Sequence, residues 1–327
     1  SAAGNITFSG TTFGASVQGN GANVLFNGSV FNAPVRVTKT GAGGTTSTGG
    51  NTFNSLLELS MASSSTWEIA YSNPDTYNGD VLVNCTGTGN LRFGFGSGSA
   101  TLAAGHILSI GTGGFSTGRL YLMDFVQTGT TPQNLTLSGT AEVYFRPGTV
   151  FNGPLTVSAP RAFMDGGTYN STVSITNTGT VSAAGAGGCT FNDRLDLYCT
   201  GAGELRLCET GTDQYNGDVV LNNTGGGIRF GNASGLCNLA AGRSLTIGSG
   251  GFSAGLLLLK GFHQLGSTPQ NLTLTGTSIL YLRPGTSFDG ALTVVSPRIM
   301  MDGGTYNSTV DLTTTSTTGS TGAGGCI

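Results

Sequence analysis

A block of residues that returns at a long, nearly fixed interval is the feature that most constrains this fold. The string YNGD at residues 77–80 recurs at 215–218, an offset of 215 − 77 = 138. Later strings keep the same order, such as TPQNLTL from 131 and again from 268, an offset of 137. A period this long, carried by apolar and turn residues alike, indicates a repeat architecture.

Inside the long period lies a shorter one, marked by an aromatic residue followed by Asn or Asp. Successive markers lie 18, 22 or 24 residues apart, for example 53 − 31 = 22 and 77 − 53 = 24. That length fits one coil of a β-solenoid, built from two or three short strands with Gly and Asn turns. The sequence therefore predicts an all-β parallel β-helix with coils of about 18–24 residues. We expect a right-handed winding, as parallel crossovers usually have.

Stacked coils place equivalent residues above one another, so each marker is assigned a structural role. The aromatic ring points inward, and the following Asn lies at the turn, where it tolerates the left-handed conformation and can bond to its neighbour one coil away. A following Gly, such as Gly79, supplies a positive φ. The predicted turn and stacking residues are Asn32, Asn54, Asn78, Asn152, Asn170, Asn192, Asn216 and Asn307.

The repeat also predicts the domain organisation. Residues 1–327 form one continuous solenoid with a shortened unit at 5–133, a full unit at 134–270 and a partial unit at 271–327. The last unit stops inside a motif, so we expect the chain to continue in a longer protein. A row of small β-sandwiches, one in each 137-residue unit, is the alternative, and the shorter internal period weighs against it.

Composition excludes two classes of partner. Charged residues make up 9% of the chain, against ~25% in ordinary domains, and the net charge is −3. The 13 basic residues are scattered, so no basic stripe is available for nucleic acid. No apolar run approaches the ~18 residues of a transmembrane helix, and we expect no membrane span.

Recurring acidic residues are the main candidates for chemistry. Asp80 and Asp218 recur, as do Asp165 and Asp302, each beside a Gly turn. Calcium ligation or paired-carboxylate catalysis is one interpretation, but a hydrolase needs two carboxylates facing one cleft. These acids recur once per unit without a histidine, which favours turn residues. We therefore predict no enzyme, and no catalytic, cofactor-binding or metal-ligating residue. Two recurring pairs are expected to be surface ion pairs: Arg161 with Asp165, and Arg298 with Asp302.

Six cysteines do not follow the repeat. Only Cys189 and Cys326 are repeat equivalents, whereas a metal site or a framework disulfide should recur in every copy. We expect small buried residues at these positions. A disulfide such as Cys199–Cys208 is the alternative.

Strings such as TYNGDV, TPQNLTLSGT and TKTGAGG…GGNTFN resemble the repeat arrays of very large surface adhesins of gliding and predatory Bacteroidota, which the type IX system exports. The resemblance spans essentially the whole chain. It implies a structural segment of an extracellular, cell-surface fibre that attaches to surfaces, glycans, or prey and host cells. Low-charge, hydroxyl-rich faces repel weakly, so we also expect a homo-oligomer or fibre bundle. The alternatives are a β-helix polysaccharide lyase or glycosidase, and a glycan- or ice-binding solenoid module.

Overall fold

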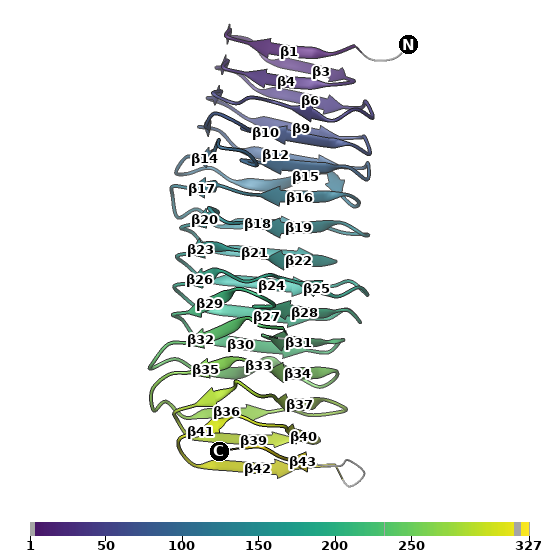
Figure 1. Ribbon diagram of the computed structural model, residues 1–327. Coiled ribbons are helices and arrows are strands. Elements are labelled where there is room, and N and C mark those ends of the chain that lie inside the picture. The colour runs from purple at the N-terminus through teal and green to yellow at the C-terminus, as the bar shows by residue number, and fades with distance from the viewer. Residues whose placement is uncertain (1–3, 232, 317–321, 327) are drawn as a thin grey trace. The chain divides into compact units, whose positions relative to one another are not determined.

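The fold is all-β, as the periods predict. A computed structural model describes residues 4–231, 233–316 and 322–326, and every regular element in them is a β-strand (Figure 1). The chain divides into two compact units, Ser1–Pro160 (unit 1) and Arg161–Ile327 (unit 2). Within each unit the chain passes through three strands per coil, and each strand pairs in parallel with its counterpart in the next coil. Each unit is therefore a parallel β-solenoid.

The first strand of each coil belongs to a sheet that carries the aromatic markers, here called the aromatic sheet. In unit 1 its strands are β2 (Thr12–Phe13), β5 (Val30–Phe31), β8 (Thr52–Phe53), β11 (Asp75–Tyr77), β14 (Ala100–Leu102), β17 (Phe125–Gln127) and β20 (Val150–Phe151). In unit 2 they are β23 (Gly167–Tyr169), β26 (Cys189–Phe191), β29 (Thr212–Tyr215), β32 (Leu236–Leu239), β35 (Phe262–Gln264), β38 (Ser287–Phe288) and β41 (Thr305–Tyr306).

The second strand of each coil builds a sheet whose outer side is rich in hydroxyl and amide groups, here called the hydroxyl sheet. In unit 1 its strands are β3 (Val17–Gly21), β6 (Val35–Lys39), β9 (Leu57–Met61), β12 (Val81–Cys85), β15 (Leu108–Phe115), β18 (Gln133–Thr136) and β21 (Leu155–Ala159). In unit 2 they are β24 (Val173–Asn177), β27 (Leu195–Cys199), β30 (Val219–Asn223), β33 (Leu245–Phe252), β36 (Gln270–Thr273), β39 (Leu292–Ser296) and β42 (Val310–Thr314).

The third strand of each coil carries most of the arginines on its outer side, and we call this the arginine sheet. In unit 1 its strands are β1 (Ile6–Ser9), β4 (Val24–Asn27), β7 (Thr45–Thr46), β10 (Thr66–Ile69), β13 (Asn90–Phe93), β16 (Arg119–Leu122) and β19 (Glu142–Phe145). In unit 2 they are β22 (Arg161–Met164), β25 (Ala183–Ala184), β28 (Glu204–Leu207), β31 (Gly227–Phe230), β34 (Leu256–Leu259), β37 (Ile279–Leu282), β40 (Arg298–Met301) and β43 (Gly322–Ala323).

Coil length follows the predicted range and in places exceeds it. Register partners in the aromatic sheet lie 18 residues apart from Phe13 to Phe31 and 25 apart from Tyr77 to Leu102. The hydroxyl sheet holds a longer excursion, because Cys85 pairs with Phe115, 30 residues on. There the glycine-rich strand β15 shifts register, and β33 does the same in unit 2. Such a bulge accommodates additional residues without breaking the sheet.

Inward side chains form columns because parallel register repeats each position in the next coil. In unit 1 the rings of Phe13, Phe31 and Phe53 stack with centroids 5.0 and 4.8 Å apart, and Tyr77 follows at 5.5 Å. In unit 2, rings 169, 191 and 215 stack at 4.9 and 5.5 Å. After the tyrosine each column continues through a leucine and a buried glutamine before the next Phe, and register places Leu102 directly after Tyr77.

The coil corners correct one expectation about backbone conformation. None of the marker asparagines has a positive φ; the described residues other than glycine with positive φ are Ala70, Asp124 and Cys208. Gly79, expected to supply a positive φ, does not have one. A Cβ at Gly79 would instead lie 2.2 Å from the carbonyl of Ser55 in the previous coil. Glycine is needed there because two backbones approach closely, not because of a left-handed turn.

Candidate functional site

Six of the eight predicted asparagines form hydrogen-bonded ladders along the edge of the aromatic sheet. In unit 1, Asn54 donates to the Oδ1 of Asn32 at 2.8 Å, and Asn78 donates to the Oδ1 of Asn54 at 2.9 Å. Asn54 therefore donates to the coil before it and accepts from the coil after it. Asn152 lies apart from this ladder and donates to the backbone carbonyl of Gln127 at 2.7 Å.

Unit 2 repeats this ladder with the same geometry. Asn192 donates to Asn170 at 2.7 Å, and Asn216 donates to Asn192 at 2.9 Å. Asn307 donates to a carboxylate, the Oδ1 of Asp289, at 2.8 Å. The asparagine-to-asparagine bonds of these exposed ladders tie successive coils together through groups that carry no net charge.

A second polar chain is buried inside unit 1. Asp75 is fully buried, and its Oδ1 accepts hydrogen bonds from the backbone N–H and the side-chain amide of Asn51, both at 2.8 Å. Asn51 in turn accepts from the N–H of Ser29 at 2.9 Å, and the Tyr77 hydroxyl lies 3.4 Å from the second Asp75 oxygen. Burial raises the pKa of Asp75 to about 6 in spite of these hydrogen bonds.

The equivalent acid of unit 2 has different neighbours. Asp213 is buried and accepts from the backbone N–H of Cys189 at 2.8 Å and from the Tyr215 hydroxyl at 3.2 Å. A disulfide joins Cys208 to Cys237, and the Cys208 sulfur lies 3.2 Å from the Oδ2 of Asp213. Burial again raises the pKa of the acid to about 6. Asp75 and Asp213 therefore occupy the same repeat position, one in each unit.

The disulfide corrects the cysteine predictions. The alternative pairing of Cys199 with Cys208 is wrong, since Cys208 bonds to Cys237 and Cys199 is a free, buried thiol. Cys85 and Cys189 are buried thiols, as expected, whereas Cys326 is exposed. We expected small buried residues at all six positions, because a framework disulfide should recur in every copy. That expectation is wrong for Cys208 and Cys237, which are bonded although the equivalent positions in unit 1 are Ala70 and Ala100. A disulfide that joins two coils can be present in one copy alone because the coils of the other copy fold without it.

A buried lysine closes an early corner of unit 1. Lys39 is fully buried, and its ammonium donates to the carbonyls of Gly41 at 2.6 Å and Gly43 at 2.8 Å. The hydroxyls of Ser63 and Ser65 lie 3.3 and 2.6 Å from it. Burial lowers the pKa of Lys39. These four oxygens thus compensate for the water molecules that the ammonium loses on burial.

The acids singled out for chemistry serve as turn acceptors. The Oδ1 of Asp80 accepts from the N–H of Ile107 at 3.1 Å and lies 3.3 Å from the Nδ1 of His106. The Oδ1 of Asp218 accepts from the N–H and hydroxyl of Ser244 at 2.8 and 3.0 Å. Each acid therefore fixes the corner of the following coil.

One of the two expected arginine–aspartate pairs is wrong. Asp302 pairs with Arg283 at 3.6 Å and accepts from the Tyr281 hydroxyl, and Arg298 is not its partner. In the other pair, Asp165 accepts from the N–H of Ala186 at 2.8 Å, and the Arg161 Nε donates to the carbonyl of Ser182. These contacts depend on which residues lie side by side in neighbouring coils, and the spacing along the sequence does not reveal that.

The arginine sheet of unit 1 carries charges interleaved with rings. The Arg92 guanidinium lies 4.2 Å from the ring of Phe95 and 5.1 Å from that of Tyr121. Tyr121 stacks on Tyr144 with centroids 4.5 Å apart. Arg119 and Glu142, paired across the same two strands, form an ion pair at 2.6 Å.

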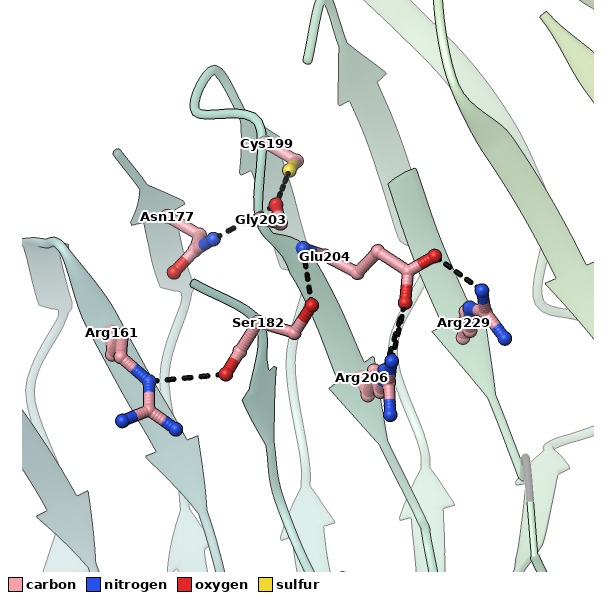
Figure 2. A network of polar contacts seen from close by, with 8 residues as sticks. All are labelled: Arg161, Asn177, Ser182, Cys199, Gly203, Glu204, Arg206 and Arg229. Atoms are coloured by element: carbon pink, nitrogen blue, oxygen red, sulfur yellow. Dashed lines mark hydrogen bonds and ion pairs between the residues drawn. The ribbon is translucent and has the colours of Figure 1, made fainter. Parts of the chain in front are cut away.

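In unit 2 the charges of this sheet are arranged differently. Glu204 lies between Arg206 and Arg229 and forms ion pairs with both, and its N–H donates to the Ser182 hydroxyl at 3.1 Å (Figure 2). Leu256 and Ile279 stand where unit 1 has the Arg119–Glu142 pair. The sheet therefore tolerates either an ion pair or an aliphatic pair at one backbone position.

A metal centre would bring several ligating side chains together, and the residues that the structure describes can be compared with that requirement. Among those residues, no three His, Cys, Asp or Glu side chains are placed to share a metal ion. The same residues contain no helix with the length and apolar character needed to cross a bilayer.

Sequence reasoning missed the buried acids, although a signal was present. Asp75 and Asp213 lie two residues before the marker tyrosines, in DTY and DQY. Because side chains alternate along a strand, a residue two positions before an inward ring also points inward. The alternation of side chains along the strand would therefore have indicated that the acid in DTY and DQY is buried. Lys39 has no counterpart in the repeat, since Asn177 occupies that position, so no recurrence indicated it.

Comparison with known proteins adds no relative: no protein-family model, no curated protein and no solved structure matches this chain.

Proposed function

We propose that this chain is a structural segment of an extracellular surface fibre or adhesin, which holds a cell to surfaces, glycans or other cells. The observation that carries the proposal is that the same ladders recur in both units. In both units the same backbone position in successive coils carries stacked rings and asparagine-to-asparagine hydrogen bonds. Contacts that repeat from coil to coil support a stiff spacer better than a single reactive centre.

The composition and the disulfide support an extracellular location. Disulfides persist in oxidising compartments and at cell surfaces, and Cys208–Cys237 is such a bond. With 9% charged residues, the outer faces carry mainly hydroxyl and amide groups, which can lie against another fibre with little repulsion. These features favour a homo-oligomer or fibre bundle, and the proposed source is a type IX-secreting member of the Bacteroidota.

Immunogold electron microscopy of the producing cells tests the proposal. An antibody against this chain should label thin fibres that extend from the cell surface. Label confined to the cell interior would contradict the fibre role.

The alternative, a β-helix polysaccharide lyase or glycosidase, is tested separately. Purified protein is incubated with neutral and uronate-containing polysaccharides, and new reducing ends and unsaturated products are measured. We expect neither above a heat-denatured control, and turnover that a single carboxylate substitution removes would establish the enzyme instead.

A further inference from the structure

A polar groove crosses three neighbouring strands of the hydroxyl sheet in unit 1. Its volume is about 160 Å³, and strands β3, β6 and β9 form its floor. Register pairs the outward side chains across these strands in two rows. The rows are Gln18–Arg36–Glu58 and Asn20–Thr38–Ser60.

One side of the groove is held rigidly. The Glu58 carboxylate accepts from the Arg36 Nε at 3.2 Å and from the Asn84 amide at 3.0 Å. The same Asn84 amide donates to the Ser60 hydroxyl at 3.2 Å. A carboxylate and a hydroxyl are thus fixed in place before any ligand arrives, which reduces the entropy lost on binding.

The other side offers hydrogen-bonding groups that the protein itself does not use. Among the contacts of the described residues, the side chains of Gln18, Asn20 and Thr38 have no hydrogen-bond partner. Arg36 engages Glu58 through Nε, and its side chain is 49% exposed. Amides, a guanidinium and a hydroxyl therefore face one opening as both donors and acceptors.

The chemistry of these groups selects a class of ligand. Arg36 and Glu58 cancel in charge, so the groove has no electrostatic preference for an ion. Apart from Val37 its lining is polar, unlike the mostly apolar pockets that take drug-sized molecules. Its volume also lies below the ~300–1,000 Å³ of such pockets. A neutral ring bearing several hydroxyls matches this size and this density of donors and acceptors.

We propose that the groove on β3, β6 and β9 binds one or two sugar units of a neutral glycan. The inference rests on the proposed attachment role and names the surface that would perform it. A single shallow polar site gives weak affinity, and attachment then depends on many copies acting together in a fibre.

Unit 2 provides a substitution that should close the groove. The residue equivalent to Ser60 is Tyr198, and the one equivalent to Arg36 is Ser174. Ser60→Tyr should therefore fill the groove with a side chain that the repeat already accepts at this position. Thr136→Tyr, at an exposed outward position on β18 of the same sheet, is the matched control.

Binding is measured by saturation-transfer NMR and titration calorimetry. The neutral probes are cellohexaose and mannohexaose, and the acidic probe is hexagalacturonate, each at up to about 10 mM. We expect a neutral probe to bind wild type and Thr136→Tyr equally. Arg36→Ala and Glu58→Gln should each weaken binding at least tenfold, and Ser60→Tyr should abolish it. Hydrogen exchange of β3, β6 and β9 verifies that each variant is folded.

Three results would overturn the proposal: no binding of either neutral probe, binding of the acidic probe alone, or equal binding by Ser60→Tyr and wild type. None of them affects the labelling of fibres in the microscope. Failure of the groove is therefore distinguishable from failure of the fibre proposal.

Discussion

In unit 1 the buried Asp75 lies beside alanines at positions 70 and 100, whereas the equivalent site of unit 2 has the Cys208–Cys237 disulfide beside Asp213. The two sites share an unusual positive φ, since Ala70 and Cys208 have φ values of 54° and 53°. One hydrogen bond to the buried carboxylate is also equivalent: in both units the backbone N–H of a residue in the previous coil donates to it at 2.8 Å. The coil geometry is thus encoded without the disulfide, which adds stability to one copy.

Removal of the disulfide should have the largest effect. Cys208 and Cys237 are 29 residues apart, and a loop of that length gives about 3–4 kcal/mol in the chain-entropy account. Cys208→Ala/Cys237→Ala, which copies the residues of unit 1, should lower the protection of unit 2 by about that amount. Hydrogen exchange of β28 to β32 measures it, with β10 to β14 of unit 1 as the internal control. Equal protection before and after the change would show that the disulfide does not stabilise unit 2.

The pH dependence of the two acids should be similar and second in size. Their pKa is about 6 in the folded state, above the ordinary value of 3.8, so the folded protein binds more protons between about pH 4 and 6. Their contribution to stability is therefore fully present below about pH 4 and is lost as pH rises through 6. The limit is about 3 kcal/mol per site. Urea unfolding from pH 4 to 7.5 should show this rise on acidification.

Asparagine replacements assign that pH dependence to each unit. Asp75→Asn should flatten it in unit 1 alone, and Asp213→Asn in unit 2 alone, because the amide oxygen can still accept from the backbone but no longer titrates. A pH profile unchanged in both variants would assign the titration to other groups.

The exposed ladders should matter less. Asn54 exchanges two hydrogen bonds with its neighbours, and Asn54→Ala should cost about 1–2 kcal/mol in unit 1. Asn192→Ala should cost the same in unit 2, because its two bonds have matching lengths. Local hydrogen exchange at β8 and β26 provides the measurement. A cost several times larger in one unit would mean that the ladders are not equivalent.

The smallest effect is expected from exchanging an ion pair for an aliphatic pair. Arg119→Leu/Glu142→Ile copies Leu256 and Ile279 of unit 2 and should change the stability of unit 1 by less than about 1 kcal/mol. Arg119→Leu alone should cost more, about 1–2 kcal/mol, because the mostly buried Glu142 loses a charged partner. Chemical unfolding of the single and double variants gives the comparison. A double variant less stable than the single one would contradict this account.

Much of the fold could be predicted because the signal was repetition. The spacing of the aromatic–asparagine markers predicts coils, and the parallel stacking of the coils within each unit follows from it. The asparagine positions could be predicted for the same reason, since a residue that recurs once per coil lies above its own copy. The conformation of the corners could not. Gly79 lies so close to the backbone of the previous coil that a side chain would not fit, and sequence spacing does not reveal that close contact.

By itself, the sequence determined the period, the all-β class, the inward rings and the outward amides, because each depends on residues repeated along the chain. The tertiary structure alone decided which cysteines join, that Asp302 pairs with Arg283, and that Gln18, Arg36 and Glu58 line one groove. These contacts link residues of different coils. Their partners depend on coil length and register, which differ from coil to coil and are set only when the strands pair.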